Sequence, residues 1–119
     1  MNVSDALIAE FTHESETTRK LLERLPEDKL SWKPHAKSMS LGELATHIAH
    51  IPEWSQTIVN DDAFDMGASD TKVHEPDSRK GILDYFDKSG EGFKNVLMGK
   101  SDEHLFQSWK LLMSAAVFA

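Results

Sequence analysis

The chain contains no cysteine, which excludes disulfide bonds, thiolate catalysis and thiolate zinc sites. It also has no glycine-rich phosphate loop and no apolar run that approaches the roughly 20 residues of a membrane-spanning helix. The N-terminus lacks the charged and apolar regions of a signal peptide. We therefore expect a cytoplasmic protein that does not interact with membranes.

Basic residues are too few for a nucleic-acid-binding protein. The 119 residues include 13 lysines and arginines against 20 aspartates and glutamates, so the formal net charge is -7. A protein that binds a phosphate backbone needs a basic stripe to displace counterions, and no such stripe is present. We therefore expect no nucleic-acid partner.

The composition and length fit a single globular domain over residues 1–119. Hydrophobic residues make up 39% of the chain and charged residues 28%, which is an ordinary balance for one modest core. There are no internal repeats and no linker between domains. The expected fold class is all-α, with three long helices and a short C-terminal segment.

The first long helix is predicted from about Ser4 to Leu25, where Pro26 follows. Its inward positions recur at helical spacing and comprise Leu7, Phe11, Ser15, Thr18, Leu22 and Leu25. Ser15 and Thr18 stand where leucines are expected. Either a polar group faces them in the core, or their hydroxyls bond back to carbonyls of their own helix.

A second helix is predicted from Ser40 to about Val59. Ser40 and Glu43 form the sequence pattern of a capping box, flanked by Met39 and Leu44 as a hydrophobic staple. Pro52 should kink this helix. A polar surface loop is expected over residues 60–76. The third helix is predicted to begin near Asp77 or Ser78, with Gly99 as its C-cap residue.

The second helix also carries two histidines, within Ser40-Leu-Gly-Glu-Leu-Ala-Thr-His47-Ile-Ala-His50-Ile-Pro-Glu-Trp54. In a helical projection His47 lies about 70° from the centre of the apolar stripe and His50 about 130° from it, so His47 is predicted to point toward the bundle and His50 toward its flank. A histidine at such an edge is either a ligand or a hydrogen-bonded core residue.

The other candidate site residues have simpler interpretations. Glu43, one turn before His47, is explained by the cap, although a role as ligand or as a group that orients the ring is open. The aspartates at 61, 62 and 65 lack the glycine and distal glutamate of an EF-hand loop, so we interpret them as a solvated loop. The remaining histidines form no ligand pair at helical spacing; they are His13, His35, His74 and His104. The tryptophans are interpreted as core anchors rather than pocket walls; they are Trp32, Trp54 and Trp109.

Two segments carry a family resemblance. Leu25-Pro-Glu-Asp-Lys-Leu-Ser-Trp-Lys-Pro-His35 and Ser38-Met-Ser-Leu-Gly-Glu-Leu-Ala-Thr-His-Ile-Ala-His-Ile-Pro-Glu-Trp54, together with the later Ser108-Trp109-Lys110, resemble the DinB/YfiT-like superfamily. The resemblance implies a four-helix bundle. It also implies a divalent metal, often nickel or zinc, held by one histidine of the second helix and two of the last. The family pattern Gly-Glu-Leu-x-x-His places the first metal ligand at His47.

The resemblance leaves two hypotheses for function. The first is a metal-dependent enzyme of the thiol-dependent transferase or isomerase class, acting on a small thiol or another small molecule. The chain ends before a His-x-x-x-His element of a last helix, so a four-helix bundle lacking its last helix is expected, and a homodimer is one source of the missing ligands. The second hypothesis is a non-catalytic, truncated bundle fragment that self-associates through the groove of the missing helix.

Overall fold

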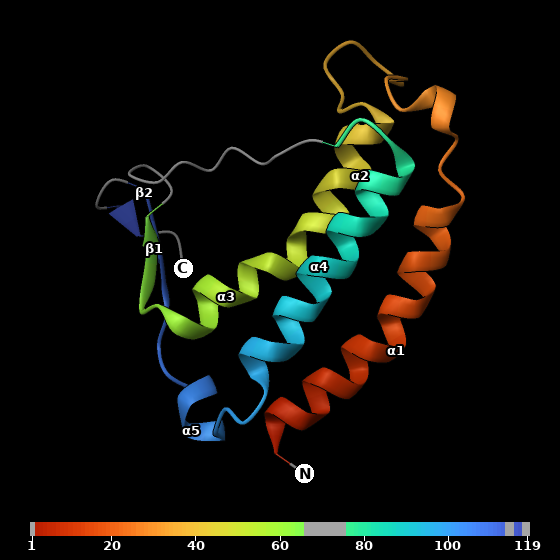
Figure 1. Cartoon of the computed structure of the whole chain (residues 1–119). Helices are drawn as coiled ribbons and strands as arrows, with labels where there is room; N and C mark the ends of the chain where they lie inside the picture. The colour runs from red at the N-terminus through yellow and green to blue at the C-terminus, as the bar shows by residue number, and fades with distance from the viewer. Residues whose placement is uncertain (1, 66–75, 114–115, 118–119) are drawn as a thin grey trace.

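Three long helical segments form most of the molecule (Figure 1), as described by a computed structural model for residues 2–65, 76–113 and 116–117. They are α1 (Val3–Glu23), the continuous run of α2 (Leu41–His50), η2 (Ile51–Glu53) and α3 (Trp54–Asn60), and α4 (Arg79–Leu97). The shorter elements are η1 (Glu27–Lys29), α5 (Asp102–Leu105), β1 (Ala63–Asp65), β2 (Lys110–Met113) and β3 (Ala116–Val117). The predicted all-α class with three long helices is confirmed.

Side-chain caps fix where these helices begin. The Ser40 hydroxyl accepts a hydrogen bond from the Glu43 N–H, and the Glu43 carboxylate accepts one from the Ser40 N–H, so the predicted capping box is present. Ser78 caps α4 in the same way, by accepting from the Gly81 N–H. Just beyond the end of α4, Gly99 has φ 77°, a left-handed conformation that favours glycine.

Pro52 interrupts the second helical segment, as predicted. The α-helical turns stop at His50, a single 3-10 turn forms η2, and α-helix resumes at Trp54. A proline has no N–H to donate to the preceding turn, so the helix must change its hydrogen-bond pattern there. The interruption places residues 51–53 at a bend between α2 and α3.

The helix α4 lies between the other two long segments (Figure 1). It packs against α1 on one side and against α2, η2 and α3 on the other, whereas α1 and α2 have few direct contacts with each other. At the α1 interface Phe11 and Phe93 have ring centroids 4.3 Å apart, and Arg19 forms two hydrogen bonds with Asp87. The main core cluster comprises Leu22, Leu25, Ala45, Ala49, Ile82 and Phe86.

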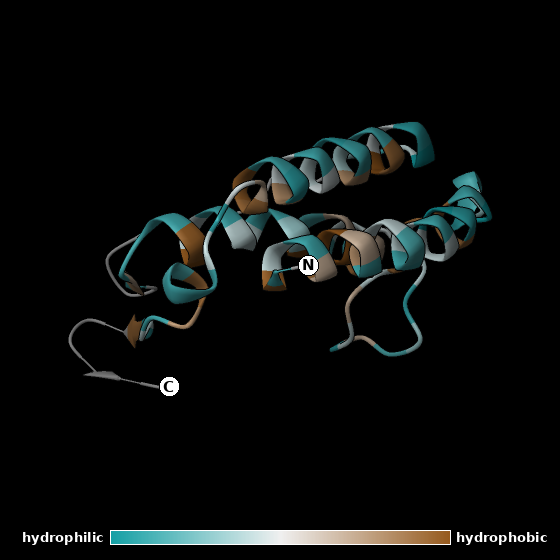
Figure 2. Cartoon of the chain, turned by 90° about the horizontal axis from the view of Figure 1, so that it is seen from below, coloured by the Kyte–Doolittle hydropathy of each residue, from teal (hydrophilic) through white to brown (hydrophobic). Residues whose placement is uncertain are grey.

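One of the two polar inward positions of α1, Ser15, has a partner that the structure identifies. The Ser15 hydroxyl donates to the carbonyl of Thr12, so Ser15 bonds back to its own helix as one of the two alternatives requires. Hydrophobic and hydrophilic residues are interspersed within each long helix (Figure 2), as expected for amphipathic segments. The core is therefore formed by one face of each long segment.

The molecule is extended for its length. The Cα radius of gyration is 16.1 Å and the principal extents are 46 × 36 × 18 Å, whereas a compact domain of this length has a radius of gyration of about 13.5 Å. Three helices with α4 in the middle leave one side of α1 and one side of α2 without a covering element among the described residues. The arrangement matches a bundle without a fourth long helix.

A small sheet joins the loop after α3 to the C-terminal segment. β1 pairs in parallel with β2, with Phe64 opposite Leu111, and β2 pairs antiparallel with β3. The prediction of an irregular loop over residues 60–76 is therefore wrong for Ala63–Asp65, because the apolar C-terminal segment offers a strand partner that is distant in sequence. The rest of that predicted loop, residues 66–75, lies outside the described residues. In the part of the chain that the structure describes, no helix is long and apolar enough to cross a membrane.

Candidate functional site

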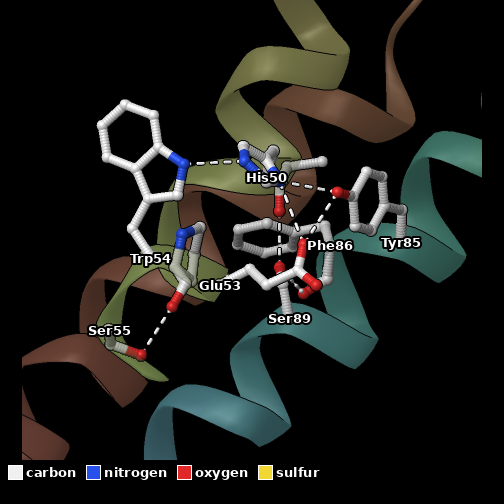
Figure 3. Close-up of polar contacts among 9 residues, drawn as sticks. His50, Glu53, Trp54, Ser55, Tyr85, Phe86 and Ser89 are labelled. Carbon is white, nitrogen blue, oxygen red and sulfur yellow. Dashed lines mark hydrogen bonds and ion pairs between the residues drawn. The ribbon is translucent and has the colours of Figure 1, made fainter. Parts of the chain in front are cut away.

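The second helix packs against α4 through small residues. Ala45, Thr46 and Ala49 are buried on α2, and the Ser89 hydroxyl of α4 donates to the carbonyl of Ala49 (Figure 3). Gly42 is also buried, but it packs against Leu30. Small side chains allow two helix backbones to approach closely, and this approach brings the residue after Ala49 within reach of α4. That residue is His50.

The predicted orientation of the two histidines is wrong. His50 is the half-buried one, with 15% of its side-chain area exposed, while His47 is exposed. The projection placed the buried direction at the mean of the large apolar residues. The actual buried direction follows the small residues, because these are what α4 contacts. Several of the large residues instead face solvent.

His50 is held by hydrogen bonds on both ring nitrogens (Figure 3). Its Nδ1 lies 2.6 Å from the Tyr85 Oη and 3.0 Å from the Glu53 Oε2. The Trp54 Nε1–H donates to the His50 Nε2 at 2.7 Å, and the Tyr85 hydroxyl donates to Glu53 at 2.8 Å. These four residues are called the His50 network below. The network ties the bend at Pro52 to α4, because Tyr85 is the α4 residue within it.

The environment of Tyr85 keeps its hydroxyl protonated. Burial, followed by the hydrogen bond to Glu53 and the charge of that carboxylate, raises the pKa of Tyr85 to about 12. The phenol therefore remains a hydrogen-bond donor to Glu53 throughout the neutral range. Glu53 accepts from Tyr85 while it also lies within hydrogen-bond distance of His50.

His47 is exposed and lies about 60° around α2 from His50. Its ring contacts the edge of Trp54, with centroids 6.0 Å apart and planes at 72°. Glu43, one turn earlier, is occupied by the capping box, and the hydrogen bonds from the Ser40 backbone and hydroxyl lower the pKa of its carboxyl group. The capping interpretation of Glu43 is thus confirmed, and His47 has no hydrogen-bond partner among the described residues.

An apolar surface surrounds His47. It comprises Leu44, His47, Ile51, Trp54 and Ile58, and is called the open face below. Its four apolar members have between 45% and 50% of their area exposed. A groove of about 230 Å³ between α1 and α2 adjoins this face at Leu44, and is lined mainly by Leu21, Leu25, Leu41, Leu44 and Ile48. Contiguous exposed apolar area of this kind marks a surface that is covered by another molecule or segment.

The remaining candidates, Trp54 excepted, are not members of the His50 network or the open face. His13 and His35 are exposed, and the Nε2 of His104 lies 2.6 Å from the carbonyl oxygen of Val59. His74 lies outside the described residues. Trp32 and Trp54 are about half exposed, so the interpretation of these two tryptophans as core anchors is wrong. Asp61 and Asp62 are exposed, as predicted for a solvated loop, whereas Asp65 is part of β1 and partly buried, so the prediction is wrong for Asp65.

Comparison with protein-family models identifies the family of this chain. The model of the DinB superfamily matches residues 10–108, which is most of the sequence. The chain belongs to the DinB superfamily. Searches of curated proteins and of solved structures gave no match. The family match covers most of α1 and all of the other two long helical segments and extends to Ser108, so the DinB resemblance seen in the sequence is confirmed.

The described residues do not fit the divalent metal that the DinB resemblance implies. Residues 2–65, 76–113 and 116–117 contain no group of three or more histidine, aspartate or glutamate side chains placed to hold a metal ion. His47 is a single imidazole beside an indole, and a catalytic zinc takes three protein ligands. His50 does not supply a second, because both of its ring nitrogens are occupied. Within these described ranges the DinB chain therefore brings no second ligand to His47.

Sequence reasoning missed two members of the His50 network. Glu53 follows His50 by three residues, a spacing that brings side chains together on a helix. This spacing could have predicted the contact between them. Tyr85 lies on α4, 35 residues away, and no local pattern in this DinB sequence connects it to His50. Contacts between helices depend on the packing of α2 against α4, which the sequence did not specify.

Proposed function

We propose that this DinB-superfamily chain is a non-catalytic helical module that self-associates through the open face. The observation that carries the proposal is the exposure of Leu44, Ile51, Trp54 and Ile58 along one side of α2, η2 and α3. Burying a large apolar side chain is worth about 1.5–3 kcal/mol, so leaving four of them half exposed in the monomer is a substantial driving force for association.

A second copy of the chain is the occupant that fits this face. Leu44, Ile51 and Ile58 recur every seven residues, and such a stripe pairs with an identical stripe about a two-fold axis. The adjoining groove at Leu21 and Leu25 widens the patch toward the roughly 800 Å² per partner of a standard interface. Pairing two open faces would also turn two flat molecules into one thicker particle.

The net charge opposes this association. Each copy carries a formal charge of -7, so two copies repel one another at low ionic strength. The open face itself contains no carboxylate, so repulsion arises from the surroundings and is screened by salt. We therefore expect the dimer to become tighter when the salt concentration rises, which is typical of apolar association between acidic proteins.

Sedimentation velocity over a concentration range from 1 to 100 µM tests the proposal. We expect the wild-type chain to form a dimer within this range and to do so at lower concentration in higher salt. Ile51→Glu places a charge in the centre of the open face and should weaken dimerisation at least 100-fold, because the carboxylate must be desolvated.

Met98→Glu is the matched control. Met98 is exposed after the end of α4 and lies outside the open face, so this variant adds the same charge without touching the proposed interface. It should dimerise like the wild type. A wild-type chain that is monomeric at 100 µM, or an Ile51→Glu variant that dimerises as tightly as Met98→Glu, would contradict the proposal.

A second candidate function is the metal-dependent enzyme that the DinB resemblance implies, of a thiol-dependent transferase or isomerase class. The specific observation in its favour is His47, an exposed imidazole with no hydrogen-bond partner among the described residues. Its further ligands would have to come from another polypeptide, and dimerisation through the open face is what would bring one to His47.

Metal analysis separates the two candidates. The chain is purified without a histidine tag, and its nickel and zinc content is measured for the wild type, His47→Ala and His50→Ala. The enzyme hypothesis requires metal in the wild type and in His50→Ala, and its loss in His47→Ala. Wild-type protein that dimerises but contains no stoichiometric metal after incubation with either ion would leave only the association module.

A further inference from the structure

The His50 network also touches the open face, because Trp54 belongs to both. The Trp54 indole donates to His50 at 2.7 Å, and its ring also makes a T-shaped contact with the ring of His47 on the open face. Figure 3 shows the indole reaching the imidazole from one side while Tyr85 and Glu53 reach it from the other. The position of Trp54 on the open face therefore depends on a hydrogen bond to His50.

The hydrogen bonds determine the protonation state of His50. An indole nitrogen only donates, so the His50 Nε2 must accept and carries no proton. The remaining ring proton is then on Nδ1, which donates to the Tyr85 Oη and the Glu53 carboxylate. The network as built requires the neutral imidazole with its proton on Nδ1.

Protonation of His50 is incompatible with the bond to Trp54. Adding a proton to Nε2 would place two N–H groups head to head at a separation of 2.7 Å, so the indole must move away. The opposite side of the ring accepts the extra charge, because the Glu53 carboxylate would form an ion pair with the imidazolium. Among the described residues, the titratable groups facing the ring are Glu53 from η2 and Tyr85 from α4, and His47 adjoins it through Trp54.

We propose that His50 is a positioning residue: its neutral ring holds the Trp54 indole in place on the open face, and its protonation releases the indole and weakens association through that face. The positioning of Trp54 stands on the geometry of the network alone. The effect on association rests on the proposed self-association, since a held aromatic side chain loses less conformational freedom when a partner binds it than a free one does.

The indole N–H signals of the ¹⁵N-labelled chain report the release directly. The chain has three tryptophans, and Trp54→Phe identifies the signal of Trp54. The pH is lowered from 8 to 5, the range in which histidine side chains ordinarily change charge. We expect the Trp54 N–H signal to shift and its exchange with water to become faster as the pH falls.

Two variants assign the transition to His50. In His50→Gln the amide oxygen accepts from Trp54 and the amide group donates to Glu53, with no charge to gain, so the Trp54 transition should disappear. His47→Gln removes the other imidazole in contact with Trp54 and should keep the transition. A wild-type signal that does not move, or a transition that persists in His50→Gln, would overturn the positioning role.

Sedimentation at pH 7.5 and pH 5.5, both in high salt that screens the change in net charge, tests the link to association. The wild type and His47→Gln should dimerise at least tenfold more weakly at the lower pH, and His50→Gln should show less than a threefold change. If the chain is monomeric at both values, the proposed self-association fails, while the indole signal still decides the role of His50. If the indole is released but dimerisation is unchanged, the regulatory half of the inference fails.

Discussion

The two sides of α2 have opposite construction. Toward α4 the helix presents Ala45 and Ala49, with His50 hydrogen-bonded on both ring nitrogens. Away from α4 it presents Leu44, His47 and Ile51, with the large side chains half exposed. The fully buried residues are thus small ones, while Leu44 and Ile51 are about half exposed. The comparison teaches that the size of an apolar side chain did not decide its burial here, because close approach to α4 requires small residues.

Two isoleucines, one of α4 in the core and one on the open face, test this contrast with the largest expected effect. Ile82 is fully buried on α4, whereas Ile51 is 45% exposed on the open face. Ile82→Ala should lower the free energy of unfolding by about 2–5 kcal/mol, because it leaves a cavity. Ile51→Ala should lower it by less than about 1 kcal/mol. Urea denaturation at 1 µM protein measures both, and equal losses would break the contrast.

The two histidines give the next largest difference. His50→Ala removes the partner of Trp54 and one partner of Tyr85, and should lower the free energy of unfolding by about 1–3 kcal/mol. His47→Ala should change it by no more than about 0.5 kcal/mol, since an exposed side chain is removed. Thermal melts of the two variants followed by circular dichroism provide the measurement. A larger loss of stability for His47→Ala than for His50→Ala would contradict the structural role of His50.

Stability at high pH tests the buried side of α2 through Tyr85 of the His50 network, the only tyrosine in the chain. Its folded-state pKa is raised to about 12, mainly by burial and then by Glu53, while an unfolded tyrosine titrates near 10. The unfolded state therefore loses its proton first, so this contribution to stability is complete below pH 10 and is lost as the pH rises toward 12. Tyrosinate absorbance should titrate near 12, and Tyr85→Phe should show a smaller fall in stability over that range than the wild type.

The smallest expected effect concerns the start of α2, which serves both sides equally. Ser40→Ala removes the hydroxyl that caps the Glu43 N–H and should lower the free energy of unfolding by about 1 kcal/mol. Chemical denaturation measures it, and the pH response of the Trp54 indole should be unchanged. A lost indole response in this variant would show that the His50 network depends on the helix start.

Local signals in the sequence predicted much of this fold. The Ser40 cap, the bend at Pro52, the Ser78 cap and the end of α4 near Gly99 were all predictable because each depends on neighbouring residues. The short strand Ala63–Asp65 was not, since its partner Lys110–Met113 lies more than 40 residues away. These two strands pair because the packing of the helices places the end of α3 close to the C-terminal segment.

The candidate site was predicted less well than the fold. His47 was selected from the sequence, and the structure brings no second ligand to it within the described residues. His50 was set aside as a flank residue and is instead the centre of a network that includes Tyr85 of another helix. Helical periodicity gives the relative angle of two side chains on one helix. It does not say which side of that helix the neighbouring helix covers.

The sequence by itself determined the all-α class, the three long helical segments and their caps, and the DinB family, because these follow from spacing and short motifs. Only the tertiary structure decided that α4 lies between α1 and α2, that His50 rather than His47 is half buried, and that a stripe from Leu44 to Ile58 is left open. The physical reason is that burial depends on which helix faces are brought into contact. Small residues on α2 allowed α4 to pack there, and Leu44 and Ile51, which point elsewhere, stayed about half exposed.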